Sequence, residues 1–109
     1  MASLRRRYRG CGRAGIIAGM KFNAAADCLA ALGNPTRLQI YRMLARSTDG
    51  MPVGRLQARL RAAPSTLSHH LKTLIEAGLV RQTRKGTTLI CRIERARLRE
   101  LMRFLGEAR

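Results

Sequence analysis

The segment from Pro64 to Val80 carries polar side chains suited to close contact with a polyanion. Leucines recur at residues 67, 71 and 74, which is the spacing of the buried side of an amphipathic helix. The opposite arc carries hydroxyls, imidazoles and an ammonium group, which can hydrogen-bond base edges and phosphates. An ordinary solvent-facing helix would show a similar polar arc. The side chains predicted here to contact nucleic acid are Ser65, Thr66, Ser68, His69, His70 and Lys72.

A basic hairpin is predicted directly after this helix. The run from Leu79 to Arg84 favours a strand, Lys85-Gly86 favours a tip, and the run from Thr87 to Glu94 alternates as a second strand. No acidic residue lies between positions 78 and 93. A basic loop beside such a helix is typical of contact with a phosphate backbone or minor groove, although a solvated turn can also be basic. The predicted contacts in the hairpin are Arg81, Arg84 and Lys85.

The two histidines do not form a convincing metal site. Consecutive helical residues point about 100° apart, so His69 and His70 cannot chelate one ion together, and no Cys or carboxylate accompanies them. His70 lies nearer the apolar arc, where part of it is expected to pack. No nucleophile–base pair or phosphate-binding glycine loop is recognisable, and acidic residues are scarce. We therefore do not expect an enzyme or a cofactor.

The three cysteines are widely spaced and form no CxxC motif. Their odd number argues against a disulfide framework and favours reduced thiols in the cytoplasm. Structural packing is the default expectation for Cys28 and Cys91, because free cysteine is usually buried. A thiol-sensing site made by Cys28 or Cys91, with Cys11 across a dimer, is the alternative, since neighbouring arginines would acidify a thiol.

The charge balance indicates a polyanionic partner. Lys and Arg number 22 against 6 Asp and Glu, for a formal net charge of +16. Such an excess is self-repelling in a folded chain and usually serves nucleic acid. Hydrophobic residues make up 46% of the chain, enough for one modest core, and aromatic residues only 4%. No apolar stretch approaches the ~20 residues of a membrane span, so no membrane is expected as a partner.

The elements that would position these residues are mostly helical. We expect a first helix from Asn23, acting as N-cap, to Leu32, and a second from Pro35 to Ser47 with Asn34 as its cap. Residues 48–52 are expected to be a connector, followed by a third helix ending near Arg61. The fourth helix begins at Pro64 and ends before Gly78. A final helix from Arg95 to about Ala108 carries an apolar stripe. The apolar positions expected on the second and final helices are Leu38, Tyr41, Leu44, Ala45, Leu98, Leu101, Met102 and Leu105.

The first 20 residues differ from the rest. They contain five arginines, four glycines and no periodicity, which predicts a flexible basic arm. Met20 precedes a typical domain start, so these residues could alternatively lie upstream of the true initiator. All six acidic residues follow position 20, and the basic excess persists without the arm. Residues 21–109 are therefore predicted to form the nucleic-acid-binding domain.

Two helices joined by a tight turn and followed by a basic hairpin predict a winged helix-turn-helix, mostly α with about five helices. The runs ALGNPTRLQIYRML and STLSHHLKTLIEAGLVRQTRKGTTLICRI closely resemble the ArsR/SmtB family of bacterial repressors. This resemblance extends from about Asn23 to Leu105. It implies a homodimer joined by its first and last helices, binding to a palindromic operator in double-stranded DNA, and release by an effector.

The departures from the family concern the effector. Arsenic sensors of the family carry paired cysteines at the start of the third helix, where this chain reads MPVGRLQARL. Zinc sensors use His and carboxylates on the last helix, where RARLRELMRFLGEAR has neither His nor Asp. The expectation is thus a sequence-specific repressor released by an unidentified effector. The alternative is a basic nucleoid or RNA-binding protein without regulation.

Overall fold

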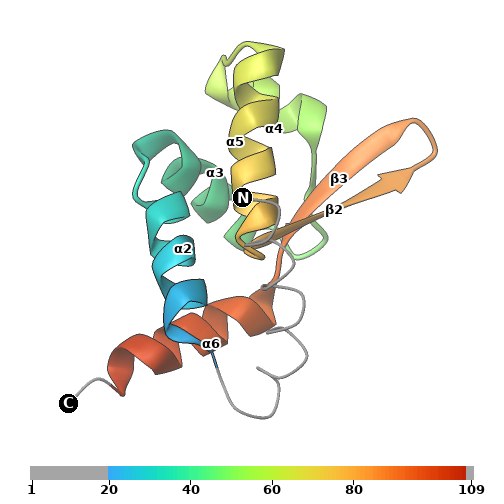
Figure 1. Cartoon of the computed structure of the whole chain (residues 1–109). Coiled ribbons are helices and arrows are strands. Elements are labelled where there is room, and N and C mark those ends of the chain that lie inside the picture. Colours follow the sequence, from blue (N-terminus) through green and yellow to red (C-terminus); the bar gives the residue numbers. More distant parts are fainter. Residues whose placement is uncertain (1–19, 108–109) are drawn as a thin grey trace.

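The computed structural model describes residues 20–107, and Figure 1 shows five helices and a small antiparallel sheet in this range. The predicted order of helices and hairpin is confirmed. The predicted arm and Cys11 lie outside the described residues, apart from Met20, which packs against the core. The helices are α2 (Phe22–Leu32), α3 (Pro35–Ala45), α4 (Val53–Leu60), α5 (Pro64–Glu76) and α6 (Arg95–Gly106). The strands are β1 (Met51–Pro52), β2 (Val80–Lys85) and β3 (Thr88–Ile93).

The starts of the first two described helices show how local chemistry sets an element boundary. The side chain of Asn34 accepts a hydrogen bond from the Arg37 backbone N–H, so the predicted cap of α3 is confirmed. The predicted cap of α2 is wrong. That helix begins one residue before Asn23, and its N-cap is Lys21, whose side chain makes no capping bond. Extended backbone at Lys21 is sufficient there because the apolar side of α2 fixes the helix by packing.

The expected connector at residues 48–52 contains a strand. Met51 and Pro52 pair with Cys91 and Ile90, so the sheet has the order β1-β3-β2. Gly50 precedes this strand with φ +86°, and a Cβ there would lie 2.7 Å from the Cys91 carbonyl oxygen. Pro52 fits because β1 is an edge strand of only two residues. The sequence analysis did not predict β1 because a strand of two residues shows no alternation of apolar and polar side chains.

A single aliphatic core joins all these elements. Its fully buried large side chains come from helices α2 to α5, from β3 and from the turn before β2, and they include Ile40, Leu44, Leu56, Leu67 and Leu79. The predicted apolar side of α3 is wrong at one position. Leu38 is 43% exposed, and Ile40 is completely buried instead.

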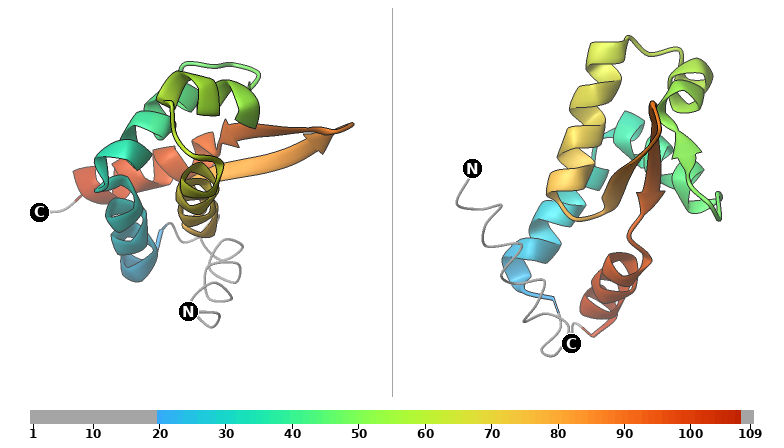
Figure 2. Two further views of the ribbon diagram at one scale, coloured as in Figure 1. Left: turned by 90° about the horizontal axis from the view of Figure 1, so that it is seen from above. Right: turned by 90° about the vertical axis from the view of Figure 1, so that its right-hand side faces the viewer.

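The arrangement separates two ends of the molecule. In Figure 1, α4 and the N-terminal end of α5 lie at the top, and α2 crosses α6 at the bottom. The β2–β3 hairpin, the wing, projects sideways from the body beside α5, as the left view of Figure 2 also shows. The fold therefore presents the helix from Pro64 and the wing at a distance from the α2–α6 end.

Candidate nucleic-acid interface

Helix α5 is anchored by its leucines and leaves its polar arc in solvent. Leu67, Leu71 and Leu74 are almost completely buried. Pro64 occupies the first helical position, and no side chain caps the helix start. The first-turn N–H groups are thus available to an anion. The structure places five predicted contact residues on the exposed arc, namely Ser65, Thr66, Ser68, His69 and Lys72.

His70 differs from its neighbours on α5. It is half-buried, and its Nδ1 atom lies 3.2 Å from Nη1 of Arg37 on α3. Burial lowers the pKa of His70, and the positive charge of Arg37 and the neighbouring His69 lower it further. The two imidazole rings are tilted by 53° with centroids 5.9 Å apart. The expected partial packing of His70 is therefore seen, with a specific partner.

The wing divides its basic residues between two faces. The register pairs Arg81 with Arg92, Thr83 with Ile90 and Lys85 with Thr88, whereas Arg84 pairs with Leu89. Because side chains alternate along a strand, Arg84 lies on the opposite face from Arg81 and Lys85. Glu94 lies 3.9 Å from the Arg81 side chain and partly balances it. Arg84 and Lys85 lie exposed at the tip of the wing, farther along β2 from Glu94 than Arg81 does.

Sequence reasoning missed the basic residues of α4. Arg55, Arg59 and Arg61 are exposed, and Arg61 adopts left-handed backbone with φ 53° at the turn into α5. No acidic residue occurs from position 50 to 75, and that gap could have identified them. In helix-turn-helix proteins the first helix crosses the DNA backbone, where arginines neutralise phosphates. We use the name basic face for the exposed polar and basic residues of α4, of the turn after it, of α5 and of the wing tip. It comprises Arg55, Arg59, Arg61, Ser65, Thr66, Ser68, His69, Lys72, Arg84 and Lys85.

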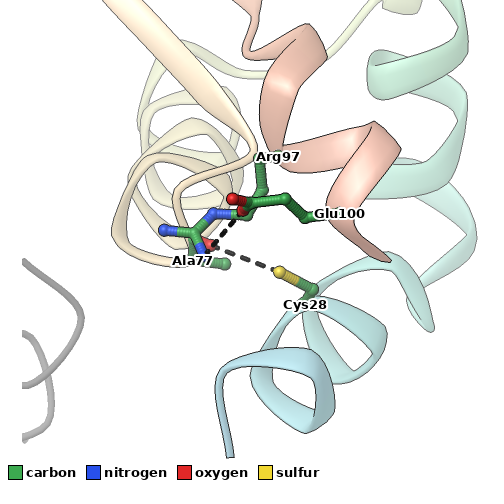
Figure 3. Close-up of polar contacts among 4 residues, drawn as sticks. All are labelled: Cys28, Ala77, Arg97 and Glu100. Atoms are coloured by element: carbon green, nitrogen blue, oxygen red, sulfur yellow. Dashed lines mark hydrogen bonds and ion pairs between the residues drawn. The ribbon is translucent and has the colours of Figure 1, made fainter. Parts of the chain in front are cut away.

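Cys28 lies where α2, α6 and the end of α5 meet (Figure 3). Its thiol donates to the Ala77 carbonyl oxygen at 3.4 Å, and burial raises its pKa to about 11. Nearby on α6, Arg97 lies 3.8 Å from Glu100 and packs against Gly78. The thiol is therefore protonated at neutral pH and serves packing.

Cys91 is also fully buried, on β3 of the wing. It accepts a hydrogen bond from the Gln82 side chain at 3.5 Å. Burial raises its pKa, and the bond from Gln82 opposes that shift. Both described cysteines thus occupy solvent-free positions that suit a neutral thiol.

The α2–α6 end carries a second kind of exposed surface. The predicted stripe of α6 divides, because Leu101 is buried whereas Met102 and Leu105 are 62% and 47% exposed. On α2, Phe22 is 75% and Leu29 44% exposed. The Phe22 ring meets the Phe104 ring edge-on, with centroids 6.0 Å apart. We call this surface the apolar face. It comprises Phe22, Leu29, Met102 and Leu105.

Residues 20–107 contain neither a cluster of metal-binding side chains nor a membrane-spanning helix. No three His, Cys, Asp or Glu side chains in this range lie close enough together to hold a metal ion. None of its helices has the length and apolar character needed to cross a bilayer.

Comparisons with known proteins agree with this geometry. The family model described as a helix-turn-helix domain matches residues 32–83. An uncharacterized HTH-type transcriptional regulator of Methanocaldococcus jannaschii is 34% identical over 87 residues, covering 80% of this chain and 97% of that protein. Matched residues 32–83 run from the end of α2 into the wing, and so include both α4 and α5.

Solved structures show the same fold. An ArsR-like transcriptional regulator from Rhodococcus sp. RHA1 superposes with a TM-score of 0.71 and 28% identity, covering 78% of each chain. HlyU from Vibrio cholerae N16961 superposes with a TM-score of 0.66 and 32% identity, covering 79% of this chain and 94% of that one. Because it shares its helix-turn-helix, its three-stranded sheet and part of its sequence with these regulators, the chain belongs to the ArsR/SmtB-type winged helix-turn-helix transcriptional regulators, a DNA-binding family.

Proposed function

We propose that this protein is a transcriptional repressor that binds a palindromic operator as a homodimer and is released by an effector. The observation that carries the proposal is the basic face, in which the polar arc of α5 is accompanied by arginine and lysine side chains from α4 and the wing tip. No acidic side chain lies in segments 50–75 and 78–93, which contain all of these residues. Such a surface suits duplex DNA, and the protein acts by binding alone, without a catalytic step.

In this proposal α5 lies in the major groove. The side chains near the centre of the exposed arc of α5 can then reach base edges. They are the hydroxyls of Ser65, Thr66 and Ser68 and the imidazole of His69. Lys72 and the arginines of α4 neutralise phosphates, and Arg84 and Lys85 hold the flanking backbone. Arg81 contributes less because Glu94 lies beside it. Base contacts then set the sequence preference, and the basic residues set the affinity.

The apolar face provides the dimer contact in the same proposal. Large side chains exposed together on α2 and α6 lose contact with water when a second copy covers them. A twofold dimer uses one such patch on both subunits, and it places two copies of α5 about one DNA turn apart. A palindromic operator matches that symmetry.

The effector is the least defined part of the proposal. A thiol route through Cys28, Cys91 or Cys11 stays a prediction, and it requires opening of the core to expose either described thiol, because both are fully buried. A nucleoid or RNA-binding protein without regulation is the competing function, and the large positive charge alone would serve it equally well.

Selection from a random duplex library by the purified chain tests the proposal. A repressor recovers one palindrome and binds it ~10³-fold or more above random DNA at physiological salt. Titration of that palindrome gives two subunits per site. Binding of all duplexes, or of RNA, with affinities within about tenfold of one another favours the unregulated alternative and rejects the repressor.

A further inference from the structure

Arg37 is fixed between the α2–α3 turn and helix α5. Its backbone N–H donates to the Asn34 side chain at 3.1 Å, and its Nε donates to the Ala31 carbonyl oxygen at 2.7 Å. Its Nη1 faces Nδ1 of His70, 33 residues later in the chain, at 3.2 Å. One bond thus fixes the backbone of Arg37 and another fixes its guanidinium, which then meets the imidazole.

This contact fixes where the proton of His70 lies. A guanidinium has five N–H donors and no acceptor, so Nδ1 must accept the hydrogen bond and carry no proton. A neutral His70 therefore carries its proton on Nε2. Protonation of Nδ1 would break the bond and place two cations side by side, which agrees with the lowered pKa of His70. The titratable groups that face this imidazole are Arg37 from α3 and His69 from its own helix.

The place of His70 on α5 determines what its free N–H can meet. Successive helical residues turn by about 100°, so His70 lies on the flank of the exposed arc on which His69 is central. Its Nε2 atom has no hydrogen-bond partner among residues 20–107. The flank of a helix in the major groove faces the sugar–phosphate wall, and the central arc faces base edges.

We propose that Arg37 is a positioning residue that makes His70 a neutral, single-tautomer hydrogen-bond donor to a DNA phosphate. This inference rests on the proposed placement of α5 in the major groove. It separates the two histidines: His69 reads bases, whereas His70 fixes the register of the helix on the backbone. Arg37 acts through His70 and need not touch DNA.

A neutral donor has a distinctive signature in salt titrations. Each phosphate neutralised by a cation adds about 0.9 to the slope of log affinity against log salt, because counterions are released. A neutral N–H adds affinity without adding to that slope. Loss of the His70 donor should therefore weaken binding to every sequence and leave the slope unchanged, unlike loss of Lys72.

The first measurement requires no DNA. Long-range ¹H–¹⁵N correlation spectra of the labelled full chain show which imidazole nitrogen carries the proton. We expect His70 to be protonated on Nε2 at neutral pH and to titrate at lower pH than a free histidine, whose pKa is about 6.5. In Arg37→Met the tautomers should mix, and His70 should titrate at higher pH. A charged or Nδ1-protonated His70 in the wild type would overturn the proposal.

The second measurement compares two His70 variants in a His69→Gln background, which removes the chain's other imidazole. His70→Gln places an N–H near the original Nε2 and should bind within about threefold of the background. His70→Asn keeps an acceptor for Arg37 but lacks the distal donor, and it should lose about tenfold on operator and random DNA alike. The salt slope should be unchanged in both, whereas Lys72→Ala should lower it by about 0.9.

The third measurement uses pH to test Arg37 directly. In the His69→Gln background the salt slope should change less between pH ~7.5 and ~6 than it does once Arg37 is also replaced. With Arg37→Met added, it should steepen at the lower pH, because His70 then becomes a phosphate-binding cation. A slope that falls by about 0.9 in Arg37→Met at pH ~7.5 would show that Arg37 itself binds phosphate and would reject the positioning role.

The failures of the two proposals are distinguishable. If no palindrome is selected, the proposed repressor function fails, yet the spectra still decide the proton position of His70. If an operator is found but His70→Asn binds as the background does, the function stands and the phosphate role of His70 is rejected. Thermal unfolding of each variant identifies any loss of affinity that comes from loss of fold.

Discussion

The basic face and the apolar face are both exposed, yet they solve opposite physical problems. Side chains on the basic face are short or charged and remain hydrated until a polyanion replaces their water. On the apolar face, Phe22 and Met102 leave large hydrophobic surfaces in water. A positive surface attracts DNA over a distance, whereas an apolar surface gains free energy only at contact. The difference indicates that one small core supports two exposed surfaces of opposite chemistry, and we propose a different partner for each.

The largest effect is expected when negative charges are introduced on the apolar face. Met102→Glu combined with Leu105→Glu should prevent dimerisation, because the carboxylates would be buried without partners. Monomers lose the effective concentration that links two half-sites, so operator affinity should fall by about 10²–10⁴-fold. Light scattering gives the mass, and operator titration gives the affinity. Arg99→Glu is the control, since Arg99 is also exposed on α6 but is not part of the apolar face.

The next test removes charge from the wing tip. Arg84→Ala with Lys85→Ala should weaken binding to operator and random DNA alike by roughly 10- to 100-fold and lower the salt slope by about two. Fluorescence anisotropy at several salt concentrations measures both quantities. Arg46→Ala with Arg99→Ala removes the same charge outside the basic face. An equal loss in that control would mean that net charge, rather than the wing, governs affinity.

A smaller effect is expected at the centre of α5. Ser68→Ala with His69→Ala should reduce the preference for operator over random DNA by about 10- to 100-fold, because base contacts carry specificity. Affinity for random DNA should change little, which makes random DNA the internal control. An unchanged preference would remove this arc from base reading, whatever the affinity.

The smallest effect on DNA binding is expected in the core between the two faces. Cys28→Ser with Cys91→Ser should leave operator binding unchanged. In a chain with Cys28 as its sole cysteine, alkylation at pH ~8 should be at least ~100-fold slower than in the unfolded chain, because the pKa rises from 9.0 to about 11.

The free energy of unfolding should also depend on pH through Cys28. The fold favours the neutral thiol of Cys28, so this contribution to the free energy of unfolding is complete below pH 9 and is lost as the pH rises toward 11. Urea titrations of the same single-cysteine chain across this range measure it. Alkylation of the native chain at the unfolded rate would instead show an accessible thiol and favour sensing by cysteine.

Much of the fold followed from local patterns in the sequence. The leucines at 67, 71 and 74 predicted which side of α5 is buried, and the alternation from Thr87 to Glu94 predicted the strand β3. Asn34 before Pro35 predicted the start of α3. These predictions succeed because periodicity and capping depend on residues only a few positions apart.

Other features depended on which elements pack together. The stripe of α6 reads as one apolar side, but the body of the protein covers Leu101 and leaves Met102 exposed. Strand β1 exists because Met51 meets Cys91, 40 residues later. The α4 arginines joined the candidate site only when the turn at Arg61 placed them beside α5.

The sequence by itself therefore determined the order of elements, the positive charge and the polar arc of α5, because each arises from composition or short-range spacing. Only the tertiary structure decided which partner His70 has. In the sequence the two histidines are adjacent and differ only in how near they lie to the apolar arc, and the fold brings Arg37 to His70 alone. A hydrogen bond between residues 33 positions apart depends on the packing of α3 against α5, which no local pattern encodes.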